Sequence, residues 1–163
     1  MDSGGEVDVD VVVVGAGFAG LYLLHRLRGA GFTTRCFEAG GGVGGTWYWN
    51  RYPGARCDVE SVEYSYSFDD DLQQEWEWTE RYAAQPEILR YASDVAERFD
   101  LRRDLRFETR VPATTFDAAT CTVPVATDRG APITARLVVR AAPSPSSRPP
   151  PARPPGPSVA APA

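Results

Sequence analysis

Three glycines near the start of the chain constrain the fold more than any other feature. Gly15, Gly17 and Gly20 have the spacing G-x-G-x-x-G, and they follow an apolar, β-branched run that begins near Val7 and ends at Val14. Such a run is typical of a strand buried on both faces. The first glycine permits a tight turn, the second lets the backbone approach a pyrophosphate, and the third lets a helix pack closely on the strand. The pattern predicts strand, phosphate-binding turn and helix, in that order.

The residues after the glycines complete the pattern of a βαβ unit. The predicted helix has an apolar stripe of Leu21, Leu24, Leu27 and Ala30. Gly31 is suited to end it, and its N-terminal amides would face the phosphates. A second predicted strand, residues 34–37, leads to Glu38, eighteen residues after Gly20. An acid at about that distance accepts hydrogen bonds from the ribose of an adenine dinucleotide, and it repels a 2′-phosphate. FAD or NAD is therefore favoured over NADP at this site.

Size and charge narrow the classes of function. The 163 residues are enough for one domain with a substantial core. A net charge of -5 gives no reason to expect nucleic acid or an anionic membrane as a partner. No apolar run approaches the roughly 18 residues of a membrane span, and the acidic N-terminus does not resemble a secretory signal.

The cysteines and the single histidine predict neither a metal site nor histidine catalysis. Cys36, Cys57 and Cys121 are scattered and odd in number, which favours a reducing cytoplasm over a disulfide framework. We interpret them as small, partly buried apolar side chains. His25 has no companion acid or nucleophile beside it, so a position on the helix surface is expected.

An unusual loop follows Glu38. Five glycines within residues 40–45 forbid regular structure, and four aromatic residues crowd into the next few positions: Trp47, Tyr48, Trp49 and Tyr52. One interpretation is a hydrophobic loop folded onto the core, with Arg51 and Arg56 as surface charges. The interpretation we favour is a loop that lines a flat ring system, fixed by Arg51, Arg56 and Asp58.

Two long runs resemble one enzyme family. The run GGTWYWNRYPGARCDVESVEYSYSF, which follows the glycine turn, is similar to Baeyer–Villiger monooxygenases of the cyclohexanone or phenylacetone monooxygenase type. The run EWEWTERYAAQPEILRYASDVAERFDLRRDLRFETRV is similar to the same family in the same order, and the resemblance covers residues 8–139. It implies an FAD-binding domain, NADPH as co-substrate, and insertion of one oxygen atom of O2 into a ketone to give an ester or lactone.

The resemblance also implies site residues by position. The cofactor-binding residues would be Gly15, Gly17, Gly20, Glu38, Thr46, Trp47, Arg56, Asp58, Tyr64 and Val111. The glycines would hold the pyrophosphate, the glutamate the adenosine ribose, and the valine backbone the adenine end. The threonine, the tryptophan and the tyrosine would lie along the cofactor or near the flavin. Asp58 would lie closest to the chemistry and place a negative charge near the flavin, without acting as a nucleophile. No metal ligands are expected.

The remainder of the chain predicts further elements of an α/β fold. A helix is expected from Asp69, with a solvated acidic start, and a clearer one from Gln85 with proline in its first turn. Residues 105–111 alternate like a strand, and residues 114–139 resemble a β-meander that Pro124 weakens unless its strand is an edge. The expected fold is a Rossmann-type FAD-binding parallel sheet with inserted helices and a β-meander, incomplete at the C-terminus.

The composition changes abruptly at Ala141. Nine of the last 23 residues are proline, and none is acidic, aromatic, leucine or isoleucine. Such a segment predicts a disordered or polyproline-like tail. The expected division is therefore a disordered N-terminus (1–7), a partial FAD-binding domain (8–140) and this tail (141–163). The tail could be a ligand for an SH3 or WW domain, but we favour an out-of-frame translation of GC-rich DNA, because the resemblance stops at one point.

These features lead to one expected function and three alternatives. The expected chain is a truncated FAD-binding portion of a flavin monooxygenase with little or no catalysis alone, since the family's second G-x-G-x-x-G domain and a downstream arginine do not occur in the sequence. The first alternative is a related monooxygenase that oxidises nitrogen or sulfur. The second is a non-catalytic dinucleotide-binding module whose proline-rich tail binds a partner. The third is a pseudogene product that does not fold stably.

Overall fold

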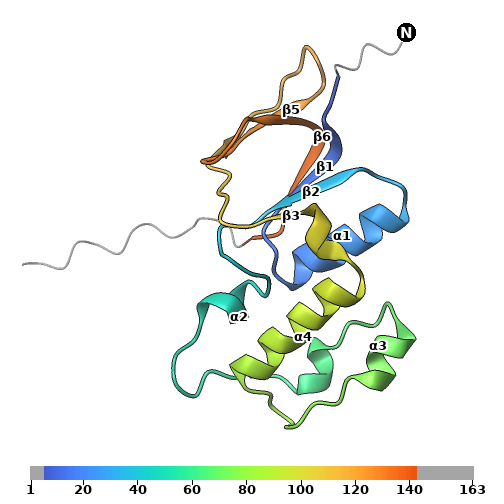
Figure 1. Cartoon of the computed structure of the whole chain (residues 1–163), viewed down its shortest axis with the longest axis vertical. Coiled ribbons are helices and arrows are strands. Elements are labelled where there is room, and N and C mark those ends of the chain that lie inside the picture. The colour runs from blue at the N-terminus through green and yellow to red at the C-terminus, as the bar shows by residue number, and fades with distance from the viewer. Residues whose placement is uncertain (1–5, 143–163) are drawn as a thin grey trace, which may run out of the picture.

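The computed structural model describes residues 6–142. It contains one six-stranded sheet in the order β3-β2-β1-β6-β5-β4 (Figure 1). The strands are β1 (Val9–Val14), β2 (Thr34–Phe37), β3 (Leu105–Arg106), β4 (Ala113–Thr114), β5 (Val123–Ala126) and β6 (Ile133–Arg140). The helices are α1 (Phe18–Gly29), α2 (Thr46–Trp49), α3 (Asp70–Glu75) and α4 (Gln85–Arg98), with 3-10 turns η1 (Ser61–Tyr64) and η2 (Leu101–Asp104).

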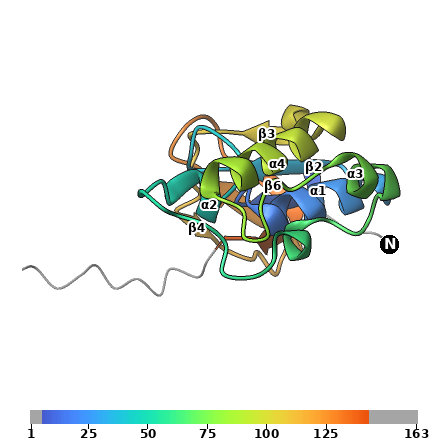
Figure 2. The same ribbon diagram turned by 90° about the horizontal axis from the view of Figure 1, so that it is seen from below.

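The first half of the sheet is the predicted Rossmann unit. β1 pairs in parallel with β2 on one side and with β6 on the other, and β2 pairs in parallel with β3. Val12 and Val13 are fully buried, which confirms that the strand is covered on both faces. The helices α1 and α4 pack on the parallel strands through a shared apolar cluster (Figure 1). In both views α2 and α3 lie on opposite sides of α4 (Figure 2).

The second half of the sheet is the predicted meander, and it is continuous with the first. The strands β4, β5 and β6 are antiparallel neighbours, and β6 also pairs with β1. Pro124 lies in β5, between two strands, where a missing N–H is unfavourable. It pairs with Thr134 of β6, whereas the short β4 reaches only Val125 and Ala126. The proline therefore lies just past the end of one neighbour, which makes it tolerable there.

Both predicted helices after residue 68 are present. Asp69 caps α3 by accepting a hydrogen bond from the backbone N–H of Leu72 at 2.7 Å. α4 has Pro86 in its first turn, and its apolar stripe is fully buried: Ile88, Ala92, Val95 and Ala96. The predicted strand over 105–111 is shorter than expected. Glu108 has a φ of +50°, and its N–H donates to the Gly40 carbonyl, so the chain leaves the sheet to bond the glycine loop.

The predictions for the two ends of the chain concern residues that the structure does not describe. Residues 1–5 and 143–163, which hold almost all of the proline-rich tail and the proposed frameshift, lie outside the described residues. Within residues 6–142, no helix is long and apolar enough to cross a membrane. The same residues hold no cluster of three or more histidine, cysteine or acidic side chains that could bind a metal.

Candidate dinucleotide site

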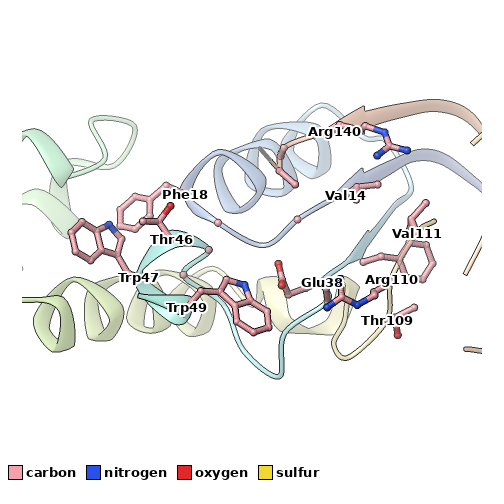
Figure 3. A pocket seen from close by; sticks show the side chains of 18 of the residues that line it. Val14, Phe18, Glu38, Thr46, Trp47, Trp49, Thr109, Arg110, Val111 and Arg140 are labelled. Carbon is pink, nitrogen blue, oxygen red and sulfur yellow. The ribbon is translucent and has the colours of Figure 1, made fainter. Parts of the chain in front are cut away.

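A cavity of about 760 Å³ opens where the C-terminal ends of β1 and β6 meet the N-terminus of α1 (Figure 3). Five segments that are far apart in the sequence line it: residues 14–18, 37–39, 44–50, 109–112 and 140–142, together with Tyr64. The carboxyl ends of parallel strands are where α/β sheets bind ligands. Figure 3 shows Thr46 and Trp47 at one end, Val111 and Arg110 at the other, and Glu38 between them.

The glycine turn forms the wall of the cavity next to α1. Gly15 has a φ of +104°, a conformation that side chains disfavour. A Cβ on Gly17 would lie 3.4 Å from the Cα of Gly45, so the two backbones approach closely here, and both glycines line the cavity. Gly20 does not line it; a Cβ there would lie 1.9 Å from the Gly15 carbonyl oxygen. The first amides of α1 have no acceptor within the helix, so this end suits an anion.

Glu38 is buried at the centre of the cavity wall and is held by two backbone amides. It is 6% exposed, and one carboxylate oxygen accepts from the Ala16 N–H at 2.7 Å. The other oxygen accepts from the Gly40 N–H, also at 2.7 Å. Each oxygen of an ionised carboxylate can accept more than one hydrogen bond, so the group keeps acceptor capacity for a ligand hydroxyl. The glutamate thereby fixes the glycine turn and the glycine loop relative to each other.

Aromatic side chains form the other end of the cavity. Trp47 is 8% exposed, and its ring meets that of Tyr64 edge to face at a centroid distance of 5.6 Å. Phe18, at the start of α1, meets the same tyrosine ring at 5.6 Å. Burial raises the pKa of Tyr64 above its ordinary value, with Cys57 and Asp58 acting in the same direction. The phenol therefore stays neutral in the physiological range and presents an uncharged aromatic surface.

Besides Gly20, the structure places two of the predicted site residues outside the cavity, Arg56 and Asp58. The Arg56 guanidinium forms an ion pair with Glu80 at 2.9 Å and donates to the Tyr82 carbonyl at 2.8 Å. These contacts hold the loop after α2 against the segment before α4. Asp58 is exposed, and no hydrogen bond or ion pair of its side chain occurs within the described part of the chain. A role for either residue near the flavin stays a prediction.

Comparisons with known proteins agree with this geometry. Residues 13–72 match the family model for an NAD(P)-binding Rossmann-like domain. A Baeyer-Villiger monooxygenase of Pseudooceanicola batsensis is 47% identical over 133 residues, which make up 81% of this chain and 24% of that protein. Phenazine N-monooxygenase PhzNO1 of Lysobacter antibioticus is 45% identical over 133 residues, 81% of this chain and 25% of that protein. Oxidized steroid monooxygenase bound to NADP superposes with a TM-score of 0.81 and 63% identity, covering 82% of this chain and 26% of that structure.

The chain corresponds to the N-terminal part of a Baeyer–Villiger flavin monooxygenase. It spans about a quarter of the length of the curated relatives that it matches. The resemblance identified from the two long runs is thereby confirmed, and so is the Rossmann-type fold class.

Two arginines in the cavity were not revealed by the sequence pattern. Arg110 and Arg140 both line the cavity, and neither forms an ion pair within residues 6–142. Arg140 lies opposite Val14 in the β1–β6 register, at the strand end beside the glycine turn. That position could have been found from the predicted return strand, because its last residue must reach the same edge of the sheet. Trp49, by contrast, belongs to the aromatic loop that the sequence predicted to line a ring system; it lines the cavity and is 57% exposed.

Neither the histidine nor any of the three cysteines lines the cavity. His25 is half-buried between the rings of Phe68 and Phe99, at centroid distances of 4.3 and 4.8 Å. Burial lowers the pKa of His25, and the neighbouring Arg26 charge lowers it further. Cys36 and Cys57 are buried and Cys121 is exposed. The histidine therefore contributes aromatic packing to α1. It is half-buried, whereas the sequence predicted a position on the helix surface.

Proposed function

We propose that residues 8–140 bind FAD as the FAD-binding part of a Baeyer–Villiger monooxygenase. The observation that supports this most directly is the single cavity wall shared by the glycine turn and Glu38. The free amides of α1 suit a pyrophosphate, and a buried carboxylate with spare acceptor capacity suits a ribose. The relatives support the same cofactor, since one is the FAD-binding monooxygenase VdtE of Byssochlamys spectabilis and another, OTEMO, has a crystal structure in complex with FAD and NADP.

The lining residues fit the two ends of such a cofactor. Gly15 and Gly17 line the cavity and would border the pyrophosphate with backbone atoms alone, because neither carries a side chain. Val111 would border the adenine, and Thr46 and Trp47 would border the flavin ring, whose size suits an aromatic wall. When bound, FAD would supply the redox chemistry, and the residues of this chain would orient it and exclude water. The two arginines at the Val111 end would add positive charge opposite the phosphates.

FAD titration into the purified 163-residue chain tests the proposal. Quenching of flavin fluorescence should be saturable, and Trp49→Ala should weaken it, because Trp49 lines the cavity and is 57% exposed. Tyr52→Ala is the matched control: Tyr52 lies three residues after Trp49, is 64% exposed and does not line the cavity. Failure of the wild-type chain to bind FAD, or equal effects of the two variants, would contradict the proposed site.

For a monooxygenase that contains this sequence as its N-terminal part, we propose oxygenation of a ketone with NADPH and O2. Similarity to a Baeyer-Villiger monooxygenase supports it, and similarity to a phenazine N-monooxygenase supports N-oxidation as the second candidate. A monooxygenase that contains this sequence as its N-terminal part, supplied with FAD and NADPH, should convert cyclohexanone to its lactone, as detected by mass spectrometry, whereas the 163 residues alone should give little or none. Formation of phenazine N-oxide without any lactone would favour the second candidate.

The domain division and the cytoplasmic location are also proposals. Limited proteolysis should leave a resistant fragment that ends near Arg140, because β6 pairs with β1 up to that residue. Cell fractionation of the tagged protein tests the location. A resistant fragment that ends well before β6 would contradict the proposed domain.

A further inference from the structure

Gln85, in the first turn of α4, is a buried polar residue that bonds away from its own helix. It is only 7% exposed. Its side-chain amide Nε2 donates a hydrogen bond to the carbonyl oxygen of Trp47, in α2. Its backbone N–H donates to the Ala55 carbonyl at 2.8 Å, in the loop that follows α2. One residue thus connects α4 to two points of the segment that carries the aromatic end of the cavity.

The short helix α2 needs such an external contact. It has four residues, and a single helical turn is not stable alone because nucleation is costly. The Trp47 carbonyl belongs to the end of this turn, where helices leave carbonyls without partners. Within residues 6–142, no backbone N–H donates to this oxygen. The Gln85 amide therefore satisfies a buried acceptor that the turn itself cannot satisfy.

Apolar contacts between α4 and α2 surround this hydrogen bond. The Trp47 ring lies in a cluster with Ile88 of α4 and with Ala83 and Cys57. Leu89 of α4 lies so close to the start of α2 that a Cβ on Gly44 would be 2.6 Å from its Cδ1 atom. Apolar packing is non-directional, whereas a hydrogen bond fixes an orientation. The amide is thus the directional contact in an otherwise apolar interface.

We propose that Gln85 is a positioning residue that holds α2 in the orientation required for binding at the aromatic end of the cavity. The proposal rests on the proposed function, in which that end receives the flavin ring of FAD. Without the amide donor, α2 would occupy its binding-competent orientation for only part of the time. The observed affinity for FAD would fall by that fraction. A residue remote from the ligand would thereby set the affinity of the site.

Glu87 provides a matched control on the same helical turn. It is 8% exposed, and its carboxylate accepts from the backbone N–H and the hydroxyl of Thr79 at 3.0 and 2.8 Å. Glu87 does not line the cavity and makes no hydrogen bond to α2. Glu87→Gln retains an acceptor at the same depth. It therefore reports the cost of altering a buried polar group in this turn without altering the Trp47 contact.

Hydrogen exchange of the ligand-free full chain tests the positioning role without FAD. Backbone amides of residues 48–50 donate to the carbonyl oxygens of Gly45 and Thr46 at the start of α2, so their exchange reports the order of this helix. Gln85→Leu should accelerate their exchange at least tenfold, and Glu87→Gln should leave it unchanged. Equal acceleration in both variants, or none in Gln85→Leu, would overturn the proposal. If the wild-type chain fails to bind FAD, the proposed function fails, and this exchange comparison still decides the role of Gln85.

The isosteric variant Gln85→Glu adds a pH-dependent readout and remains useful if Gln85→Leu does not fold. An ionised glutamate has no donor for the Trp47 carbonyl, whereas a protonated one donates its O–H. Burial raises the pKa of such a carboxyl group, so it can become protonated as the pH falls towards about 5. The affinity of the Gln85→Glu variant for FAD should therefore be at least tenfold weaker than that of wild type at about pH 8 and should recover towards about pH 5. Wild type and Glu87→Gln set the baseline over the same range. Wild-type affinity of Gln85→Glu at about pH 8 would overturn the proposal.

Discussion

Gly20→Ala should destabilise the chain far more than an ordinary glycine substitution in a helix. A Cβ at this position would lie 1.9 Å from the Gly15 carbonyl oxygen and 3.0 Å from its carbon, both backbone atoms. Contacts of a Cβ below 3.0 Å essentially do not occur, so α1 and the glycine turn would have to separate by at least 1.1 Å (3.0 minus 1.9). Overpacking costs about 1–3 kcal/mol where side chains can adjust. Backbone atoms cannot rotate aside, so we expect about 3 kcal/mol.

Urea unfolding followed by tryptophan fluorescence measures this cost. With a slope of about 2 kcal/mol per molar urea, a loss of about 3 kcal/mol lowers the midpoint by about 1.5 M. Gly29→Ala is the control, because it lies at the end of the same helix and its Cβ would meet nothing within 4 Å. That variant should be unchanged or more stable by up to about 1 kcal/mol. Equal midpoints for the two variants would refute the close approach of α1 to the turn.

Three further predictions concern buried polar and sulfur groups. Glu38→Gln should lower stability by about 1–3 kcal/mol in a thermal melt, because the two backbone N–H groups bond to different carboxylate oxygens and the NH2 group that replaces one of them cannot accept; an unchanged melting temperature would contradict the bonding described. The His25 pKa is lowered in the folded state, so the unfolded state binds more protons and stability should fall as the pH drops below about 6.5. An NMR titration of this single histidine should give a midpoint below the ordinary pKa of histidine. A midpoint above it would mean that stability rises, and does not fall, as the pH drops. A thiol reagent should modify Cys121 at once and Cys36 only on unfolding, because burial, with the nearby Glu38 charge, raises the pKa of the Cys36 thiol; equal rates would contradict its burial.

The βαβ unit could be predicted from the sequence because each of its signals is local. A β-branched run, a glycine turn, an apolar stripe and an acidic strand end occur within about 30 residues, and the structure has strand 34–37 as predicted. The terminating glycine is also as predicted, since Gly31 has a φ of +87° just after the last turn of α1. These features depend on neighbours in the chain and not on distant contacts.

The remaining site residues depend on contacts that sequence spacing does not encode. The strand predicted over residues 105–111 ends early, because Thr109 donates its N–H to the Glu38 carbonyl and leaves the ladder. Arg110 thereby reaches the cavity, although nothing in its local pattern indicates a ligand. Gln85 has the sequence signature of a helix start, and only the structure shows that its amide bonds to a residue 38 positions earlier.

The sharing of β6 between the two halves of the sheet has a consequence for synthesis on the ribosome. β1 emerges first, yet its partner on one edge is β6, and Thr134 bonds Asp8 across 126 residues. During translation β1 can pair with β2 early, while its other edge stays open until nearly all of the described chain has been made. Open strand edges template aggregation, and pairings this distant in sequence form slowly. Cotranslational folding should therefore be completed only when β6 closes the sheet, and chaperone dependence should be greatest just before that point.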